Sequence, residues 1–156
     1  MIEVQEITKQ YGEKVVLDKV GMQFNRGKIT SLIGGNGAGK STLLSIISRL
    51  PSQDGGVVLV DEKNITEYKS KMLAQRLSIL KQSNHIRLKL TVRELVSFGR
   101  FPYSQEKLTK EDIKMVDRAI DFLNLKEIEH SYIDELSGGQ KQRAYMAMVV
   151  AQDTEY

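Results

Sequence analysis

A glycine-rich run that ends in Lys40, Ser41 and Thr42 has the clearest capacity for chemistry in this sequence. Residues 34–42 read GGNGAGKST, which satisfies the spacing G-x-x-x-x-G-K-[ST]. Glycines let backbone N–H groups turn toward an anion, at conformations that a β-carbon forbids. The lysine then supplies positive charge to the phosphates, and the hydroxyl that follows is a ligand for Mg²⁺. The run therefore predicts a loop that binds a nucleoside triphosphate.

We expect this loop to hold a nucleoside triphosphate and Mg²⁺ through nine consecutive residues: Gly34, Gly35, Asn36, Gly37, Ala38, Gly39, Lys40, Ser41 and Thr42. Lys40 should reach the β- and γ-phosphates, and the Ser41 hydroxyl should ligate the metal. The alternative is a glycine-rich turn that meets the spacing by chance. An apolar run at 28–33 predicts a strand before the loop, and residues 41–50 have the apolar spacing of a helix after it, which disfavours chance.

A second glycine pair follows a potential helix cap near the end of the chain. Residues 136–140 read LSGGQ, so Ser137 can cap a helix over residues 137–150 and Gln140 can complete a capping box. Gly138 and Gly139 leave room for an anion at the helix N-terminus. The alternative is an ordinary capped helix without a ligand.

The two motifs together resemble the ABC ATPases, and the resemblance extends over nearly all 156 residues. It implies an α/β fold: a P-loop NTPase (ABC ATPase) core with an antiparallel β subdomain and a helical insert, incomplete at the C-terminus. It also implies a head-to-tail homodimer in the intact protein. In that dimer the signature residues Ser137, Gly138, Gly139 and Gln140 would cover the γ-phosphate held by the other chain's P-loop.

The resemblance extends to two single residues. Gln82, 42 positions after Lys40, is similar to the Q-loop glutamine, which contacts Mg²⁺ and the attacking water in that family. Tyr11 is similar to the aromatic residue that stacks on adenine. The alternatives are a solvated loop glutamine and a half-buried tyrosine at a strand end.

Residues 91–103, TVRELVSFGRFPY, are similar to a segment of the ATPases that serve importers of ferric siderophores, haem and cobalamin. The similarity implies that ATP is coupled to uptake of a metal chelate. It also implies membrane permease subunits as partners and a cytoplasmic, peripheral location on the inner face of the cell membrane. The alternative is a generic helix in which Leu95, Val96 and Phe98 are buried.

Residues 57–62, VVLVDE, match the apolar-then-acidic pattern of a Walker B strand. However, Asp61 follows Lys40 by only 21 residues and Gly55-Gly56 precedes the segment. The resemblance to the ABC ATPases implies an ordinary antiparallel strand at this position. The family's Walker B strand and switch histidine would lie beyond residue 156, and we therefore predict that this chain is hydrolysis-deficient. His85 and His130 are expected to be solvated or capping residues.

Composition excludes several classes of protein. A chain of 156 residues with 40% hydrophobic and 28% charged residues is typical of one globular domain. Charge-free stretches at 29–39 and 144–152 are too short to span a bilayer. The chain has no cysteine, and its start lacks a signal-peptide pattern, so we expect a cytosolic protein. The net charge of +3 comes from scattered residues and predicts no nucleic-acid partner.

Periodicity gives the remaining elements. Strands are expected at 2–7, where Ile2, Val4 and Glu6 alternate, at 15–24 with Val16, Val20, Met22 and Phe24 on one face, at 57–60, and at 78–80. Helices are expected around 70–76 and between 91 and 125. Capping-box starts pair Thr91 with Glu94 and Thr109 with Asp112. Beyond the second start, one apolar face consists of Ile113, Val116, Ile120 and Leu123.

We expect one truncated domain with three parts: residues 1–82 as the nucleotide-binding core and β subdomain, residues 83–140 as the helical subdomain, and residues 141–156 as the return to the core. Two other functions remain open. One is a catalytically silent nucleotide-binding module. The other is a non-transport ABC protein, which is disfavoured because the 53 residues between Gln82 and Leu136 leave room only for a compact helical insert.

Overall fold

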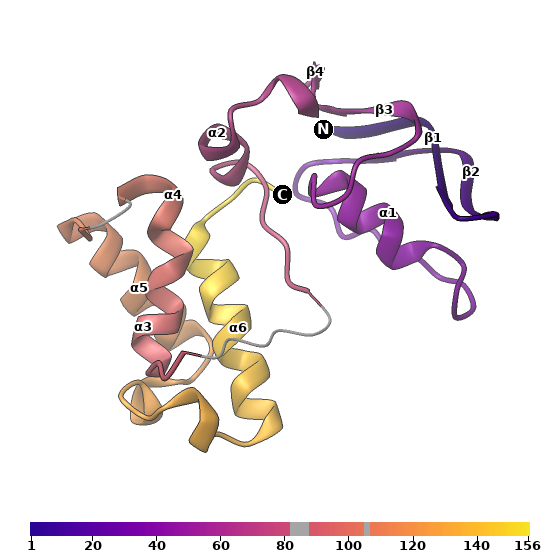
Figure 1. Cartoon of the computed structure of the whole chain (residues 1–156). Helices are drawn as coiled ribbons and strands as arrows, with labels where there is room; N and C mark the ends of the chain where they lie inside the picture. The colour runs from indigo at the N-terminus through magenta and orange to yellow at the C-terminus, as the bar shows by residue number, and fades with distance from the viewer. Residues whose placement is uncertain (82–87, 105–106) are drawn as a thin grey trace. The chain divides into compact units, whose positions relative to one another are not determined.

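The computed structural model of the chain describes residues 1–81, 88–104 and 107–156 (Figure 1). Two compact units are present. The first comprises Met1–Leu73 with Glu155, and the second comprises Ala74–Thr154 with Tyr156. Gln82 and His85 lie outside the described residues.

The first unit contains a four-stranded antiparallel sheet with the strand order β2-β1-β3-β4. Its elements are β1 (Ile2–Tyr11), β2 (Lys14–Phe24), helix α1 (Lys40–Ile47), β3 (Gly55–Val60), β4 (Lys63–Asn64), the 3₁₀ turn η1 (Ile65–Glu67) and α2 (Ser70–Ala74), whose last residue belongs to the second unit. Short turns connect the antiparallel pairs β1–β2 and β3–β4, whereas β3 reaches β1 after the segment that contains α1. The predicted antiparallel β subdomain is therefore confirmed.

A bulge in β1 changes which side chains face the core. Ile2, Val4 and Ile7 are buried, whereas Glu6 is exposed with a φ of 49°. The predicted alternation through Glu6 is wrong, because the extra residue shifts the register between Val4 and Ile7. Gly56 on β3 lies against this bulge with a φ of 81°, and an added β-carbon would overlap the carbonyl oxygen of Glu6.

Strand β2 contains a second irregularity. Leu17 is the buried residue of this strand, while the predicted inward residues are only half-buried: Val16, Val20, Met22 and Phe24. Lys19 has a φ of 44°, and the β1–β2 register shifts beside it. The single uninterrupted face predicted for this strand is therefore wrong, because a bulge reverses the alternation of side chains.

The predicted strand at 28–33 is also wrong. Residues 28–35 are assigned neither helix nor strand, and the side chains of Ile29 and Ile33 are 99% and 94% exposed. The sequence pattern is that of a parallel strand buried on both faces, and such a strand exists only between hydrogen-bonded neighbours. Within the described part of the chain, no strand pairs with this segment.

Strand β3 contains most of the segment with the Walker B pattern. It pairs antiparallel with β1 on one side and with β4 on the other. Asp61 and Glu62 form the turn between β3 and β4, both with positive φ, and Asp61 Oδ1 accepts a hydrogen bond of 2.7 Å from the N-terminal amine. The prediction of an ordinary antiparallel strand is confirmed.

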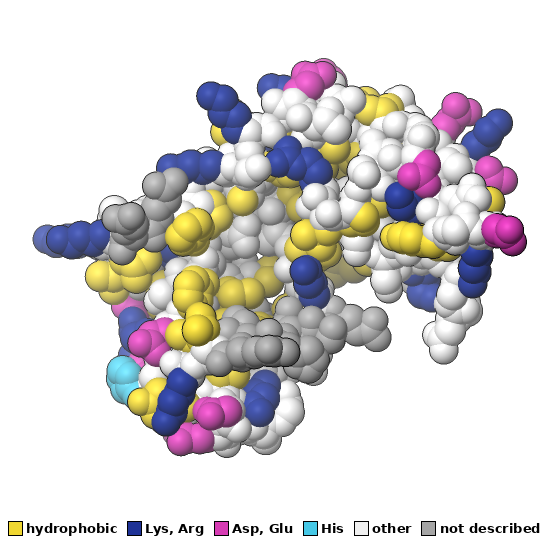
Figure 2. Space-filling model, in the orientation of Figure 1, with side chains coloured by type: hydrophobic (Ala, Val, Ile, Leu, Met, Phe, Trp, Pro, Cys, Tyr) yellow, Lys and Arg dark blue, Asp and Glu magenta, His cyan; other side chains and the backbone are white. Residues whose placement is uncertain are grey.

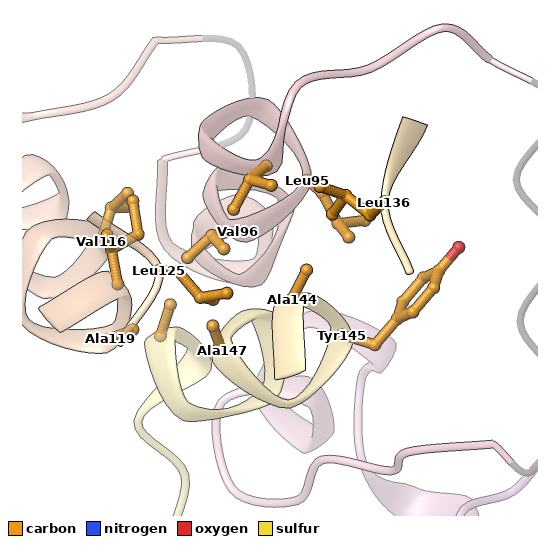
Figure 3. Packing of buried hydrophobic residues seen from close by; sticks show 12 residues of the cluster. Leu95, Val96, Val116, Ala119, Leu125, Leu136, Ala144, Tyr145 and Ala147 are labelled. Carbon is orange, nitrogen blue, oxygen red and sulfur yellow. The ribbon is translucent and has the colours of Figure 1, made fainter. Parts of the chain in front are cut away.

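The second unit is helical around one apolar core. Its elements are α3 (Val92–Ser97), η2 (Phe98–Arg100), α4 (Phe101–Ser104), α5 (Lys110–Phe122), η3 (Lys126–Ile128), η4 (Ile133–Glu135) and α6 (Gly138–Gln152). Figure 3 shows that Leu95 and Val96 of α3 and Val116 of α5 belong to one cluster with Ala144 and Ala147 of α6. Ala144 and Ala147 are both fully buried, and their small side chains let the other helices approach α6 closely.

Two helices of this unit begin at the capping residues that the sequence predicts. Thr91 caps α3 with Glu94, and Thr109 caps α5 with Asp112, each in a complete capping box. Both predictions are confirmed. The apolar face of α5 is only partly as predicted: Val116 and Ile120 are buried and Leu123 packs on the core, but Ile113 is 44% exposed.

The predicted strand at 78–80 is not assigned, yet its first residue is hydrogen-bonded to Tyr156. Ser78 N–H donates to Tyr156 O, and Tyr156 N–H donates to Arg76 O, both at 3.0 Å. This alternation around Leu77 is the hydrogen-bond pattern of a parallel pair. The second unit thus begins and ends at neighbouring positions.

Charged side chains of both signs are interspersed over the face of the molecule drawn in Figure 2. Among the described residues, no helix combines the length and the apolar composition needed to cross a bilayer.

Candidate nucleotide-binding site

The glycine-rich run forms a loop that leads directly into α1. Gly37 and Gly39 have φ values of 80° and 82°, in the left-handed region that favours glycine. Gly39 is the N-cap of α1 and packs against β2. A β-carbon at Gly39 would lie 2.7 Å from both Leu17 Cδ2 and Val16 O. Glycine is therefore required at position 39 by both backbone conformation and space.

The loop closes around the ammonium group of Lys40. Lys40 Nζ donates to Gly34 O at 2.8 Å and to Gly35 O at 2.7 Å. Ala38 N–H donates to Gly35 O at 3.3 Å, which turns the chain before the helix. The predicted loop residues are thus brought together around one positive charge.

The loop fits an anionic ligand. An added β-carbon at Gly35 or Gly37 would meet open space, and the first turn of α1 contains no acidic residue. The N-terminus of a helix has free N–H groups and a positive dipole end, both of which favour a phosphate. ATP is therefore compatible with this part of the chain.

Mg²⁺ fits the same place only in part. Ser41 follows Lys40 at the start of α1 and is exposed, so its hydroxyl is accessible as a metal ligand. In the described ranges no group of three or more His, Cys, Asp or Glu side chains could hold a metal. Mg²⁺ beside a nucleotide needs few protein ligands because phosphates and water supply the others. The role predicted for Gln82 lies outside the described residues.

Tyr11 ends β1 beside the hairpin that leads to β2. Its side chain is 52% exposed, and Lys9 Nζ lies 5.4 Å from the centroid of its ring. An exposed ring of this kind can stack on a base. Tyr11 belongs to the same unit as the loop at 34–42.

The signature residues form the first turn of α6, in the second unit. Ser137 is the N-cap: its N–H donates to Gln140 Oε1 at 2.9 Å, and Gln140 N–H donates to Ser137 Oγ at 3.4 Å. An added β-carbon at Gly138 or Gly139 would meet no atom within 4 Å. The predicted cap is confirmed, and the two glycines leave the helix N-terminus open.

A further cavity, which sequence reasoning did not locate, lies in the second unit. It has a volume of about 380 Å³ and is lined by Arg93, Glu94, Ser97, Phe98, Phe101 and Leu108. Phe98 and Phe101 are 47% and 58% exposed. Phe98 is therefore not a core residue, unlike Leu95 and Val96 of the same segment. In the sequence, the two phenylalanines three positions apart indicated an apolar patch on one side of a helix.

A group of ion pairs fixes the polar side of this cavity. Arg93 Nε donates to Glu129 Oε2 at 2.9 Å, and Arg93 also pairs with Asp117. Hydrogen bonds from Lys126 and Arg93 hold the pKa of the buried Glu129 carboxyl below its usual value. His130 is exposed, as predicted, with its Nε2 3.6 Å from Glu129 Oε1.

The sequence profile of the family described as ABC transporter matches residues 17–156. The chain belongs to the ABC transporter family. The petrobactin import ATP-binding proteins YclP of Bacillus subtilis (strain 168) and FatE of Bacillus anthracis are 54% and 51% identical to it over all 156 residues. The ferric enterobactin transport ATP-binding protein FepC of Escherichia coli (strain K12) is 38% identical over 96% of the chain. This ABC chain spans 62% of the length of YclP and FatE and 56% of FepC.

Solved structures of ABC cassettes have the same fold. The dimeric cassette MJ0796 superposes with a TM-score of 0.84 at 28% identity, over 99% of this chain and 71% of that one. The cassette MJ1267 gives a TM-score of 0.83 at 26% identity, over 98% and 65%. The predicted P-loop NTPase fold of the ABC ATPases is confirmed.

Proposed function

We propose that this chain is the ATP-binding part of an ABC importer, which couples ATP binding and hydrolysis to uptake of an iron-siderophore-type metal chelate. The observation that carries the proposal is the loop at 34–42. Two of its glycines have positive φ, Lys40 Nζ bonds to the carbonyl oxygens of Gly34 and Gly35, and the helix that begins at Lys40 has no acidic residue in its first turn. Family membership supports ATP as the ligand.

The residues have separate tasks in this proposal. Backbone N–H groups of residues 34–39 and of the first turn of α1 hold the phosphates, and Lys40 neutralises their charge. Ser41 provides a hydroxyl to Mg²⁺, Gln82 contacts the metal and the attacking water, and Tyr11 stacks on adenine. The metal's contribution is to withdraw charge from the β- and γ-phosphates. Asn36 and Ala38 lie in the loop and Thr42 lies in the first turn of α1, and all three belong to the proposed nucleotide site.

Siderophore import is supported by the relatives. YclP and FatE bear names that specify petrobactin import, and FepC bears one that specifies ferric enterobactin transport. The segment 91–103, which is similar to metal-chelate importers, forms α3, η2 and the start of α4. We infer a siderophore as the transported class.

Membrane permease subunits are the proposed partners, and the inner face of the cell membrane is the proposed location of this cytoplasmic protein. The cavity beside Phe98 and Phe101 is a suitable docking place, because exposed aromatic side chains in a concave site anchor partner helices. The charges of Arg93 and Glu94 at its rim would fix the orientation of the docked segment.

A second copy of the chain completes the ATP site in this proposal. The signature turn Ser137–Gln140 of one chain faces the γ-phosphate on the P-loop of the other, head to tail. The open N-terminus of α6 supports this, because an anion can reach its N–H groups. In terms of domains, we infer residues 1–82 as nucleotide-binding core with the β subdomain, 83–140 as helical subdomain and 141–156 as the return to the core.

The 156 residues alone are expected to hydrolyse ATP negligibly. Phosphoryl transfer needs a positioned water and metal. The one described segment with a Walker B pattern, 57–62, is an edge hairpin of the antiparallel sheet. Phosphate release at a rate comparable with that of an intact ABC ATPase would refute this expectation.

The test of the proposed function is ATP binding. Calorimetry on the wild type and on Lys40→Ala should show that removal of the enclosed ammonium abolishes most of the affinity. Lys114→Ala is the matched control, since Lys114 is 67% exposed and has only a 3.8 Å contact with Glu111. Equal affinity of Lys40→Ala and the wild type would sink the assignment of the loop.

A further inference from the structure

The two consecutive residues Gly99 and Arg100, in η2, contact the last turns of α6. An added β-carbon at Gly99 would overlap Met148 O and would lie 3.1 Å from Gln152 N and 3.2 Å from Ala151 Cβ. The backbone of η2 therefore rests directly on α6. A side chain of any size at position 99 would push the two elements apart.

Arg100 binds three elements at once. Its side chain is only 7% exposed. Its Nε donates to Asp112 Oδ1 in the first turn of α5 at 2.8 Å. Its Nη1 donates to Ala151 O in the last turn of α6 at 2.9 Å. The guanidinium also lies 3.9 Å from the ring centroid of Tyr103 in α4. A cation at the C-terminus of a helix interacts favourably with its dipole and its free carbonyls.

Asp112 is fixed in turn. Its Oδ2 accepts hydrogen bonds from Thr109 N at 2.9 Å and Thr109 Oγ1 at 2.6 Å, in the capping box of α5. Both members of the Arg100–Asp112 pair are buried, and in some proteins a buried ion pair specifies one geometry more than it adds stability. The position of α6 is thus tied to the start of α5 by directional bonds.

The opposite end of α6 is the signature turn. The helix has 15 residues, a length of about 22 Å, and its N-terminus contains Gly138 and Gly139. A rigid helix held at its C-terminal end transmits any change of tilt to its N-terminal end. The direction of the N–H groups at 138–140 follows the tilt of the whole helix. The contacts of residues 99 and 100 act on that tilt together with the core packing of Ala144 and Ala147.

We propose that Gly99 and Arg100 are positioning residues that set the tilt of α6 and thereby aim the signature turn. The functional half of this inference rests on the proposed role of the signature turn in a two-chain ATP site. The geometric half, which is the claim that these two residues set the tilt of α6, rests on the contacts of η2 alone.

The test uses variants that keep the helical unit folded. Arg100→Met combined with Asp112→Leu replaces the buried pair by apolar side chains, and Arg100→Lys keeps the charge but loses the fork that reaches both partners. Arg118→Met is the control, because Arg118 lies on α5 and its side chain contacts Met115 at 3.9 Å. Circular dichroism on heating establishes which variants are folded.

Three quantities are then measured: residual dipolar couplings of α6 relative to α3 and α5, ATP affinity of the single chain, and ATP-dependent association of two chains by sedimentation. In the double variant we expect changed couplings in α6, unchanged ATP affinity and association weakened by roughly tenfold. Arg100→Lys should show a smaller change of the same kind, and Arg118→Met none.

Unchanged α6 couplings in folded variants of Arg100 would overturn the inference, whatever happens to stability. If the couplings change but ATP-dependent association does not, the functional half is wrong. If the wild type shows no ATP-dependent association, the proposed two-chain site fails, and the dipolar couplings still decide the geometric claim.

Discussion

At the scale of single residues, Asp112 is a buried carboxyl group with a lowered pKa. Burial alone would raise its pKa, but hydrogen bonds from Thr109 and Arg100 outweigh burial and lower the pKa from 3.8 to about 2. The folded state therefore favours the carboxylate. This contribution to stability is present in full above the unfolded pKa and is lost as the pH falls through the folded pKa.

We predict that Asp112→Asn changes the pH dependence of folding. Urea unfolding should show that the wild type loses about 2 kcal/mol more than the variant between roughly pH 5 and pH 2, because the variant has no carboxylate to protonate. Asp121→Asn, on the exposed face of the same helix, is the control. A difference between wild type and Asp112→Asn that stays constant with pH would contradict the assignment.

At the scale of elements, helix starts were predictable and strand details were not. The caps at Thr91, Thr109 and Ser137 follow from four-residue patterns, because each cap bonds only to its own first turn. The bulge at Glu6 depends on the neighbouring strand and on Gly56, so periodicity along β1 could not reveal it. The exposure of Phe98 likewise depends on which helices cover it.

The cap of α6 has two separable roles. Ser137→Ala should lower the unfolding free energy by about 1 kcal/mol, because one N–H of the first turn loses its acceptor. Ser137→Asp should restore stability, since aspartate caps equally well, yet its negative charge should repel the γ-phosphate and weaken ATP-dependent association. Chemical denaturation and sedimentation measure the two effects, and equal association of Ser137→Asp and wild type would argue against a phosphate at this turn.

At the scale of the whole molecule, the largest departure from the sequence prediction is the segment 28–33. Its apolar, β-branched pattern predicts a strand, but strand formation requires neighbours that the described residues do not provide. Loop and helix formed as predicted after it, because glycine conformations and helix spacing are local properties. Long-range pairing is the part of the fold that local patterns determine least.

The exposure of Ile29 and Ile33 predicts concentration-dependent self-association of the 156-residue chain, since unpaired extended segments with apolar side chains pair with one another. Ile29→Thr with Ile33→Thr should reduce association at unchanged helix content. Phe122→Thr is the control, because Phe122 is 75% exposed but lies on a helix. Light scattering over a range of concentrations measures the effect, and equal association of the double variant and wild type would speak against this segment.

The hydrogen bonds that join Tyr156 to Arg76 and Ser78 have a consequence for how this sequence tolerates change. Because residues at the start and the end of the helical unit are hydrogen-bonded to each other, a change in the length of a loop within that unit displaces little of the chain that precedes it. Evolution can therefore remodel the helical unit, with its aromatic cavity, while the phosphate loop stays the same.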